Sequence, residues 1–422
     1  MKPNLQPRLI AYLAIKDVIE KKITAPLALN RIKNFNQLNE LDSKFTKSLV
    51  FETLRHYGQA KTILNQYIKR KFSGKKKDVE YVLVMAIVQL KYLKIPSHAV
   101  VDTAVELIKE IKQKYFSGLV NAILHAISRD IDKNNPDALT NLPSWMREKW
   151  VATYGEEQVR SFLDVFNGDM FLDISVKDDT EIWAKKLNAE VLPTGTLRCH
   201  MVENITSLDG YEEGAWWVQD ASAALPVHLF SNVKGKRGAD LCSAPGGKTA
   251  QLVAKGAYVD AYDISEKRLI RLKENIKRLN IEDKVTVICS DALQIEQDEL
   301  YDFILLDAPC SATGTIKRHP DLLHIRTYED VMRLSQLQKE LLTHAVSLLK
   351  KGGELVYSTC SLEDEENELL IQSFLKEHTN MKRHTPTAPF LKPFLNEFGA
   401  VQVLPSNKIV QDGFYAVLLK KE

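Results

Sequence analysis

Short β-rich runs alternate with amphipathic helical stretches in the half of the chain that follows Trp217. Strands separated by helices of about 10–20 residues are typical of a parallel, doubly wound sheet. We therefore predict an α/β fold with mostly parallel strands for this half. The predicted strands are residues 238–242, 258–264, 284–291, 301–307, 354–359 and 416–419. Ligands of such sheets bind at the carboxyl ends of the strands, where these runs end in Asp, Gly or Cys.

The first part of the chain has a different pattern, because its apolar residues recur at helical spacing, as in Leu9, Tyr12 and Val18. Almost no alternating pattern is present from residue 7 to about 130, so we predict a bundle of about five to seven helices. A stretch rich in Asn, Asp and Pro, residues 132–143, is typical of a linker.

The stretch between these two parts is mixed in character. Two helical segments are expected at 145–154 and 155–167, and strand-like runs lie near 171–176 and 197–201. The sequence therefore predicts an all-α domain at 1–132, a small α/β connecting subdomain at 140–215, and a doubly wound α/β domain at 216–422.

The charge of the chain is distributed unevenly. Residues 1–77 hold 17 Lys or Arg against 5 Asp or Glu, a local charge of +12. Because the 422-residue chain carries +2, the remaining 345 residues carry −10. A basic end of this kind is either a solvated helical surface or a surface that contacts nucleic acid.

Cysteine usage and hydropathy exclude several classes of protein. The five cysteines are an odd number and include no CxxC pair, which disfavours a disulfide framework and a zinc ribbon. We expect no metal. The longest apolar run, residues 81–90, is too short to span a membrane. No secretory signal is recognisable, so we expect a cytoplasmic protein.

A glycine turn follows the first predicted strand of the sheet, in residues 240–249. It is not a P-loop, because position 242 is Cys where that motif requires Gly, and no G-x-G-x-x-G fingerprint is present. Taken alone, the turn is either an ordinary strand-to-helix connection or a backbone to which a ligand comes close.

Three aspartates favour a ligand site at this turn. Asp263, Asp291 and Asp307 end the next three predicted strands. An acidic residue at the end of the second strand typically binds a ribose diol. The pattern predicts a nucleoside-binding crevice, and an uncharged or cationic nucleoside fits it better than ATP.

Two cysteines fall at neighbouring strand ends. Cys310 follows Asp307 closely, and Cys360 follows the strand at 354–359. A lone cysteine near a strand is usually a core residue, but two at the ligand-binding edge favour a functional role. Ser361, followed by acidic residues 363–365, is interpreted as the N-cap of a helix.

At this point the motifs resemble the S-adenosylmethionine-dependent RNA cytosine-5 methyltransferases, whose catalytic domain is Rossmann-like. The resemblance is carried by residues 218–220, 240–249, 307–310, 314–321, 358–361 and 412–415. The N-terminal helices, with residues 54–56, 95–99 and 116–129, resemble the NusB-like RNA-binding domain. Together they are similar to the bacterial 16S rRNA methyltransferases of the RsmB/Sun type, which are directed to cytosine 967. Ser243 departs from the commoner Ala, and Leu323 and His324 stand where a Trp often follows.

The resemblance implies roles for individual residues. Cys360 would be the nucleophile, Cys310 would promote its release, and Asp307 with Lys248 would stabilise the activated base. S-adenosylmethionine would be held by Cys242, Ser243, Ala244, Pro245, Gly246, Gly247 and Lys248, together with Asp263, Asp291 and Asp307.

The expected partner is 16S rRNA. We expect the protein itself to be a monomer. Reaching a base atom in structured RNA requires the nucleotide to be turned out of its stack, so phosphate contacts are needed. Candidates are Arg268, Lys317, Arg318 and the basic N-terminal helices. Two alternatives stay open: the same chemistry on tRNA or 23S rRNA, or a non-catalytic NusB-like RNA-binding protein.

Overall fold

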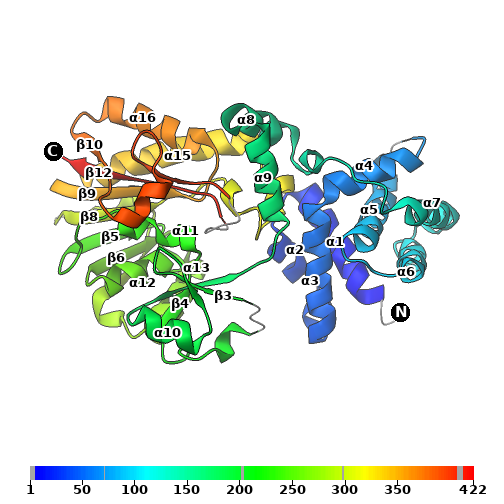
Figure 1. The fold of residues 1–422 in the computed structure, drawn as a ribbon, viewed down its shortest axis with the longest axis horizontal. Helices are drawn as coiled ribbons and strands as arrows, with labels where there is room; N and C mark the ends of the chain where they lie inside the picture. Colours follow the sequence, from blue (N-terminus) through cyan, green and yellow to red (C-terminus); the bar gives the residue numbers. More distant parts are fainter. Residues whose placement is uncertain (1–4, 71, 201–203, 297–298, 406–411) are drawn as a thin grey trace. The chain divides into compact units, whose positions relative to one another are not determined.

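The structure is a computed structural model that describes residues 5–70, 72–200, 204–296, 299–405 and 412–422. Its contacts divide the chain into two compact units, Met1–Asn167 with Arg318–Tyr328, and Gly168–Lys317 with Glu329–Glu422. Figure 1 labels their elements. The division into domains at 1–132, 140–215 and 216–422 stays a prediction.

The first unit is built from helices. Within its described residues these are α1 (Gln6–Lys21), α2 (Ala25–Arg31), α3 (Glu40–Arg55), α4 (Tyr57–Tyr67), α5 (Lys77–Lys91), α6 (Ser97–Glu110), α7 (Ser117–Asp130), α8 (Ser144–Tyr154), α9 (Glu156–Phe166) and α14 (Leu322–Ile325). The helical repeat read from the sequence up to about residue 130 is therefore confirmed.

Helix α5 forms the centre of this unit. All its residues from Val79 to Leu90 are buried, and it packs against α1, α3, α4, α6 and α7. A helix that is apolar on every side lies inside a core. None of the helices in the described ranges is long and apolar enough to cross a membrane.

The short segment that carries α14 belongs to the helical unit, although it lies in the sequence between two elements of the other unit. The backbone N–H of Ala25 donates to Asp321 Oδ2 at 3.0 Å, and His324 Nε2 donates to the carbonyl of Leu54 at 2.7 Å. Burial lowers the pKa of His324 to about 4, which keeps the imidazole neutral. The motif at 314–321 therefore spans both units.

A small antiparallel sheet opens the second unit. Its order is β2 (Glu190–Val191), β3 (Leu197–Cys199), β1 (Leu172–Val176) and β4 (Trp216–Val218), with α10 (Thr180–Lys186) packed against it. Met201, at the end of the predicted 197–201 run, lies outside the described residues. Trp216 packs into this small core and Trp217 into that of the main sheet, because successive side chains of a strand point to opposite faces.

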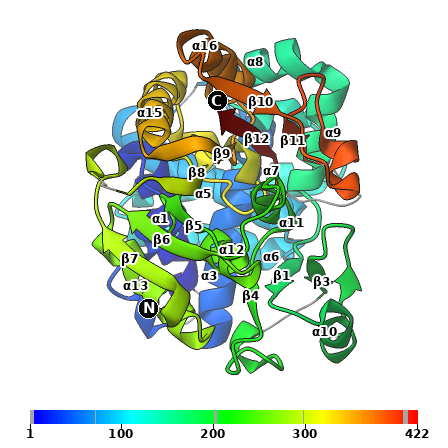
Figure 2. The same cartoon turned by 90° about the vertical axis from the view of Figure 1, so that its left-hand side faces the viewer.

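The main sheet has the strand order β10-β12-β9-β8-β5-β6-β7, with β11 paired to β12. Its strands are β5 (Arg237–Leu241), β6 (Tyr258–Asp263), β7 (Val285–Cys289), β8 (Tyr301–Asp307), β9 (Leu349–Thr359), β10 (Met381–His384), β11 (Val401–Val403) and β12 (Phe414–Lys421). Strands β5 to β9 pair in parallel, whereas β12 is antiparallel to β9. The predicted mostly parallel sheet is confirmed, and Figure 2 shows its strands in this order.

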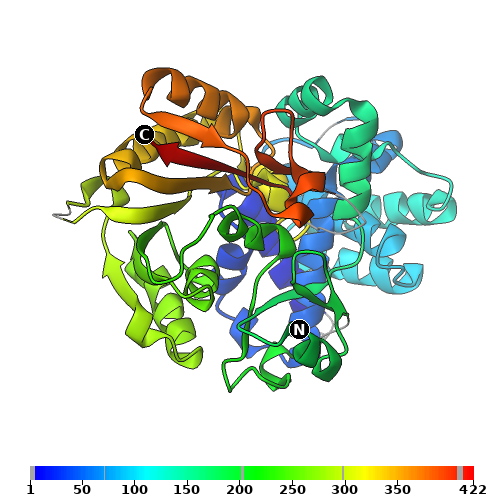
Figure 3. The same cartoon turned by 60° about the vertical axis from the view of Figure 1, so that its left-hand side comes forward.

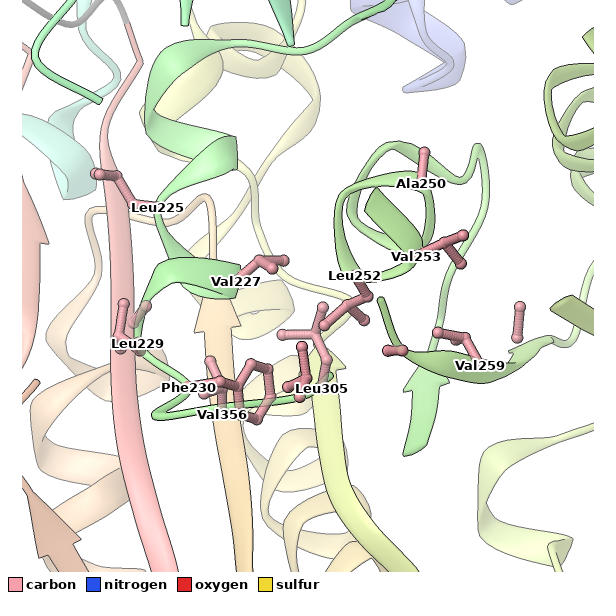
Figure 4. Packing of buried hydrophobic residues seen from close by; sticks show 14 of the residues in the cluster. Leu225, Val227, Leu229, Phe230, Ala250, Leu252, Val253, Val259, Leu305 and Val356 are labelled. Carbon is pink, nitrogen blue, oxygen red and sulfur yellow. The ribbon is translucent and has the colours of Figure 1, made fainter. Parts of the chain in front are cut away.

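Helices cover both faces of the main sheet. On one face lie α11 (Ala221–Ala224), α12 (Gly247–Ala254) and α13 (Glu266–Arg278), and on the other lie α15 (Tyr328–Ser347) and α16 (Glu368–Glu377). Strand β8 contributes Phe303 and Leu305 to the first face and Ile304 and Leu306 to the second. A strand buried on both faces is apolar throughout, which is why it is easily recognised in the sequence. Figure 4 shows Leu305 packed with Phe230, Leu252 and Val356.

Four strands were not expected from the sequence. β2 has two residues, β4 and β11 have three each and β10 has four, too few for a recognisable repeat. Figure 3 shows β12, in dark red, between β10 and β9. Strand β12 is also longer than predicted, because it pairs with both β9 and β10. Strand β9 begins earlier than predicted, at Leu349, which pairs with Tyr301 of β8.

Candidate active site

The site residues come from the carboxyl ends of adjacent parallel strands. Cys242 follows β5, Asp263 ends β6, Asp307 ends β8 and Cys360 follows β9. Since β9, β8, β5 and β6 are neighbours in the sheet, these strand ends lie side by side.

The glycine turn after β5 is held by its own backbone and by β6. Cys242 and Gly246 adopt positive φ angles of +63° and +99°. The N–H of Ser243 donates to the carbonyl of Tyr262 at 2.9 Å, and that of Gly246 donates to the carbonyl of Ser243 at 2.8 Å. The turn is therefore rigid, and it leads into the N-terminus of α12, where the first amides have no acceptor within the helix.

Asp263 fixes this turn from β6. Its Oδ2 accepts the N–H of Ala244 at 3.2 Å and lies 3.0 Å from Nη1 of Arg268, while its Oδ1 accepts the N–H of Ser265 at 2.9 Å. The side chain is 1% exposed. A carboxylate has about four lone-pair sites, of which these contacts use three. Arg268, predicted as an RNA contact, also donates to the carbonyl of Ala244, so its guanidinium braces the turn.

Asp291 and Thr249 make further side-chain hydrogen bonds near the turn. Asp291 Oδ1 accepts the N–H of Leu293 at 3.0 Å and begins the 3-10 turn η9 (Ala292–Gln294). Thr249 Oγ1 donates to the buried Asp240 Oδ2 at 2.6 Å. In a P-loop this hydroxyl would face a metal ion, so its burial agrees with the exclusion of that motif.

The turn lies in an acidic environment. The pKa of the Cys242 thiol rises to about 12, first because of burial and then because of the carboxylates of Asp263, Asp307 and Asp240. Two of these carboxylates are paired with cations, Asp263 with Arg268 and Asp307 with Lys248.

Lys248 connects the glycine turn to the end of β8. Its Nζ lies 2.7 Å from Asp307 Oδ2, while Asp307 Oδ1 accepts the hydroxyl of Ser358 at 2.9 Å. Burial would lower the pKa of Lys248, but the Asp307 carboxylate outweighs it and the pKa is raised. Nζ also lies 5.1 Å from the ring centroid of Phe414. The ammonium is therefore charged and in a fixed position.

The two cysteines face each other, with Sγ of Cys310 3.5 Å from Sγ of Cys360. Their hydrogen bond and burial raise the pKa of the Cys310 thiol well above its usual range, which keeps it protonated. The N–H of Gly314 donates to the carbonyl of Cys360 at 2.9 Å, and the N–H of Gly413 donates to that of Gly314 at 2.8 Å. Three segments that are distant in sequence thus meet around the thiol pair.

The segment after Cys360 is not the predicted helix start. Helix α16 begins at Glu368, and Ser361 is followed by a loop and the 3-10 turn η11 (Asp364–Glu366). Ser361 Oγ accepts the N–H of Glu363 at 3.0 Å and donates to the side chain of Glu366. The prediction was wrong because the segment folds around this buried carboxylate, which the sequence did not distinguish from its acidic neighbours.

The RNA-contact candidates differ in exposure. Lys317 is 3% exposed, and its Nζ lies 5.8 Å from the ring centroid of Phe171. Its ammonium is therefore not presented at the surface, contrary to what a phosphate contact requires. Arg318 is exposed and begins the segment of the helical unit that carries α14.

The fold and the site define a methyltransferase with a Rossmann-like domain. The crystal structure of a methyltransferase homolog protein from Pyrococcus horikoshii matches with a TM-score of 0.56 and 28% identity, covering 70% of this chain and 99% of that one. The crystal structure of PH0851 has the same fold, with a TM-score of 0.77 and 24% identity, over 98% of this chain and 99% of that one.

Family comparisons narrow this class. The 16S rRNA methyltransferase RsmB/F family matches residues 228–420, and the NusB family matches residues 5–129. Ribosomal RNA small subunit methyltransferase B of Escherichia coli O6:H1 is 34% identical over 441 residues, covering 100% of both chains. The chain belongs to the RsmB/F family of 16S rRNA methyltransferases, which confirms the resemblance read from its motifs.

Proposed function

We propose that this chain methylates carbon 5 of a cytosine in 16S rRNA, at position 967, through a covalent bond from Cys360 to the base. The observation that carries the proposal is the thiol pair, with Sγ atoms 3.5 Å apart, beside the Lys248–Asp307 ion pair. A nucleophile, a second thiol and a charged hydrogen-bonding pair at one sheet edge are what addition to a cytosine ring requires. The similarity to ribosomal RNA small subunit methyltransferase B of Escherichia coli supports the rRNA substrate.

The residues at the glycine turn fit S-adenosylmethionine, a cationic nucleoside that supplies a methyl group from its sulfonium. The carboxylates of Asp263 and Asp307 lie near Cys242 and can face that charge, and the positive φ of Gly246 lets the backbone turn closely. Residues 242–248 would hold the cofactor, with Asp307. Asp263 and Asp291 would take its hydroxyl groups.

Carbon 5 of cytosine is a poor nucleophile, so the ring must first be activated. The Cys360 thiolate adds to carbon 6, and the electron pair of the 5,6 double bond moves toward carbon 5 and the N3 edge. N3 takes up a proton as it receives this electron density. Asp307, held by Lys248 and Ser358, would then accept hydrogen bonds from N3–H and from the N4 amino group and so stabilise the protonated ring.

Release reverses the addition after carbon 5 has gained its methyl group. The carbon-5 proton leaves to a base, the 5,6 double bond forms again and the bond from carbon 6 to Cys360 breaks with the electron pair on sulfur. The protonated Cys310 thiol, in hydrogen-bond contact with that sulfur, can stabilise the departing thiolate.

The test compares three cysteine variants with the wild type, each incubated with S-adenosylmethionine and 16S rRNA. After denaturation, we expect a protein–RNA adduct with Cys310→Ala and none with Cys360→Ala. Cys289→Ala is the matched control, since Cys289 is exposed at the end of β7, and it should behave as wild type. The reverse pattern would exchange the two roles, and wild-type turnover in both variants without adduct would refute the covalent mechanism.

The substrate is tested separately by bisulfite mapping of the methylated base. Free 16S rRNA, the small ribosomal subunit, 23S rRNA and tRNA are offered in parallel. We expect a single modified cytosine at position 967 of 16S rRNA. Modification of only tRNA or 23S rRNA would keep the chemistry and reject the target, and RNA binding without any methylation would reject enzymatic function.

A further inference from the structure

A buried carboxylate lies behind the two cysteines. Glu366, in the turn η11, is 0% exposed. Its Oε1 accepts the N–H of Ser311 at 2.8 Å and Nε2 of Gln338 at 2.9 Å, and its Oε2 accepts the hydroxyls of Ser311 and Ser361. Four donors match the capacity of one carboxylate.

The donors come from residues next to the cysteines. Ser311 follows Cys310 and Ser361 follows Cys360, so one side chain joins the two chain segments that carry the thiols. The hydroxyls of the two serines are also 2.9 Å apart. The backbone of Glu366 is held as well, because Tyr357 donates its hydroxyl to the Glu366 carbonyl at 2.6 Å.

Energy alone does not explain a carboxylate at this place. Burial raises the pKa of Glu366, while the hydrogen bonds from Ser311, Ser361 and Gln338 act in the opposite direction. Replacing a buried ionic group by well-packed apolar residues is often neutral or stabilising. A carboxylate retained behind two reactive thiols is therefore best understood through the geometry that it imposes.

The two cysteines depend on this network to different degrees. Cys360 directly follows Thr359, the last residue of β9, which is paired with both β8 and β12. Cys310 stands three residues beyond the end of β8, and the Ser311 next to it supplies two of the four donors. Loss of the carboxylate should thus displace Cys310 more than Cys360.

We propose that Glu366 is a positioning residue that holds the Cys310 thiol against Cys360, so that release of the methylated base depends on it. The inference rests on the covalent mechanism of the proposed function. The side-chain hydrogen bonds of Glu366 go to Ser311, Ser361 and Gln338, so it acts on the cysteines through the two serines that follow them.

The test is Glu366→Gln, which keeps the shape of the side chain. Its NH2 group would face groups that themselves donate hydrogen bonds to Glu366, so part of the network would be lost. We expect kcat to fall by about 10–100-fold and KM for S-adenosylmethionine to change by less than about 3-fold. The specific readout is the denaturation-resistant adduct, which should accumulate in Glu366→Gln at a level between wild type and Cys310→Ala. The double variant Glu366→Gln/Cys310→Ala should accumulate no more than Cys310→Ala, because both changes affect one step.

Glu368→Gln is the matched control. Glu368 is a buried glutamate two residues away, and it pairs with Arg383 at 2.6 Å and accepts the Tyr415 hydroxyl at 2.9 Å. Its loss should lower the melting temperature without accumulation of adduct. If both glutamine variants behave alike, Glu366 has only a structural role and the inference fails.

Milder variants keep the test decisive if Glu366→Gln does not fold. Ser311→Ala removes one of the two donors next to Cys310 and should slow release, whereas Ser361→Ala should slow it less. Equal behaviour of both variants and wild type would overturn the inference. Absence of adduct in Cys310→Ala itself would instead overturn the covalent mechanism, so the two failures are distinguishable.

Discussion

The ammonium of Lys248 lies 2.7 Å from Oδ2 of Asp307 and joins the cofactor segment to the edge that carries the cysteines. Lys248 belongs to the first turn of α12 and Asp307 is the last residue of β8. The second oxygen of the carboxylate is fixed by Ser358. A carboxylate held at both oxygens cannot rotate freely, so its orientation toward a bound base is set in advance.

Asp307→Asn should therefore lower kcat by about 10²–10³-fold, since it keeps the shape of the side chain but removes the negative charge that stabilises the ring protonated at N3. Steady-state kinetics with 16S rRNA measures this effect. Lys339→Met is the control: the Lys339–Glu377 pair at 2.6 Å is partly exposed, and its loss should leave kcat unchanged. Near wild-type turnover of Asp307→Asn would remove Asp307 from the mechanism.

Asp240 should make stability depend on pH. Burial raises its pKa to about 7, with the Asp307 and Asp263 carboxylates acting in the same direction and Thr249 and Lys248 acting against them. The folded state keeps this proton up to about pH 7, whereas the unfolded chain loses it near pH 4. The contribution of Asp240 to the free energy of unfolding is therefore fully present below pH 4. It is lost as the pH rises through 7.

Asp240→Asn cannot ionise and should remove this loss. We expect its melting temperature to decrease less than that of wild type between pH 5 and pH 8. Over the same range its free energy of unfolding should rise relative to wild type by about 2–4 kcal/mol. Thermal unfolding across this range provides the measurement. Parallel curves for the two proteins would show that Asp240 does not titrate there.

Gly314 should not tolerate a side chain. A Cβ there would lie 2.3 Å from the Gly413 carbonyl oxygen and 2.8 Å from that of Cys360, and both are backbone atoms. Gly314→Ala should lower the free energy of unfolding by about 1–3 kcal/mol or more. It should also reduce methylation, because the new methyl group would push the Cys360 backbone away from Gly314. Gly118→Ala, in α7 with nothing within 4 Å, should instead gain about 0.5–1 kcal/mol. Equal melting temperatures of Gly314→Ala and wild type would contradict the close approach of these backbone segments.

Removing one partner of the buried ion pair Arg198–Asp173 should destabilise the fold more than removing both. Two hydrogen bonds of 2.8 Å join them, and the side chains are 6% and 2% exposed. Arg198→Met should cost about 3–5 kcal/mol because Asp173 keeps an unpaired buried charge, and adding Asp173→Asn should recover much of this loss. Lys350→Met, which breaks a partly exposed pair with Asp302, should cost less than about 1 kcal/mol. Chemical denaturation measures the free energy of unfolding of each variant. If the effects of Arg198→Met and Asp173→Asn simply add in the double variant, the two residues are not coupled.

Much of the fold could be predicted because it depends on local patterns. The apolar runs that became β5, β6, β8 and β9 are buried on both faces, and α5 is apolar on every side. The short strand β4 escaped prediction because three residues carry no period, and its two tryptophans face different cores.

The candidate site was predictable for the same reason, as far as strand ends are concerned. Asp307, Cys310 and Cys360 follow strands that the sequence reveals, and parallel strands bring their ends to one edge. The acidic run 363–366 contains no local signal that separates the buried Glu366 from its neighbours. Only the contacts made by distant residues do so.

The sequence by itself determined which residues stand at the strand ends, since strand periodicity and turn residues are encoded locally. The tertiary structure decided which groups those residues satisfy: Asp263 braces the glycine turn with Arg268, Lys317 is buried near Phe171, and Glu366 joins the two cysteine segments. The physical reason is that a buried polar group must find its partners in space. Those partners here are separated by 5 to 146 positions in the chain.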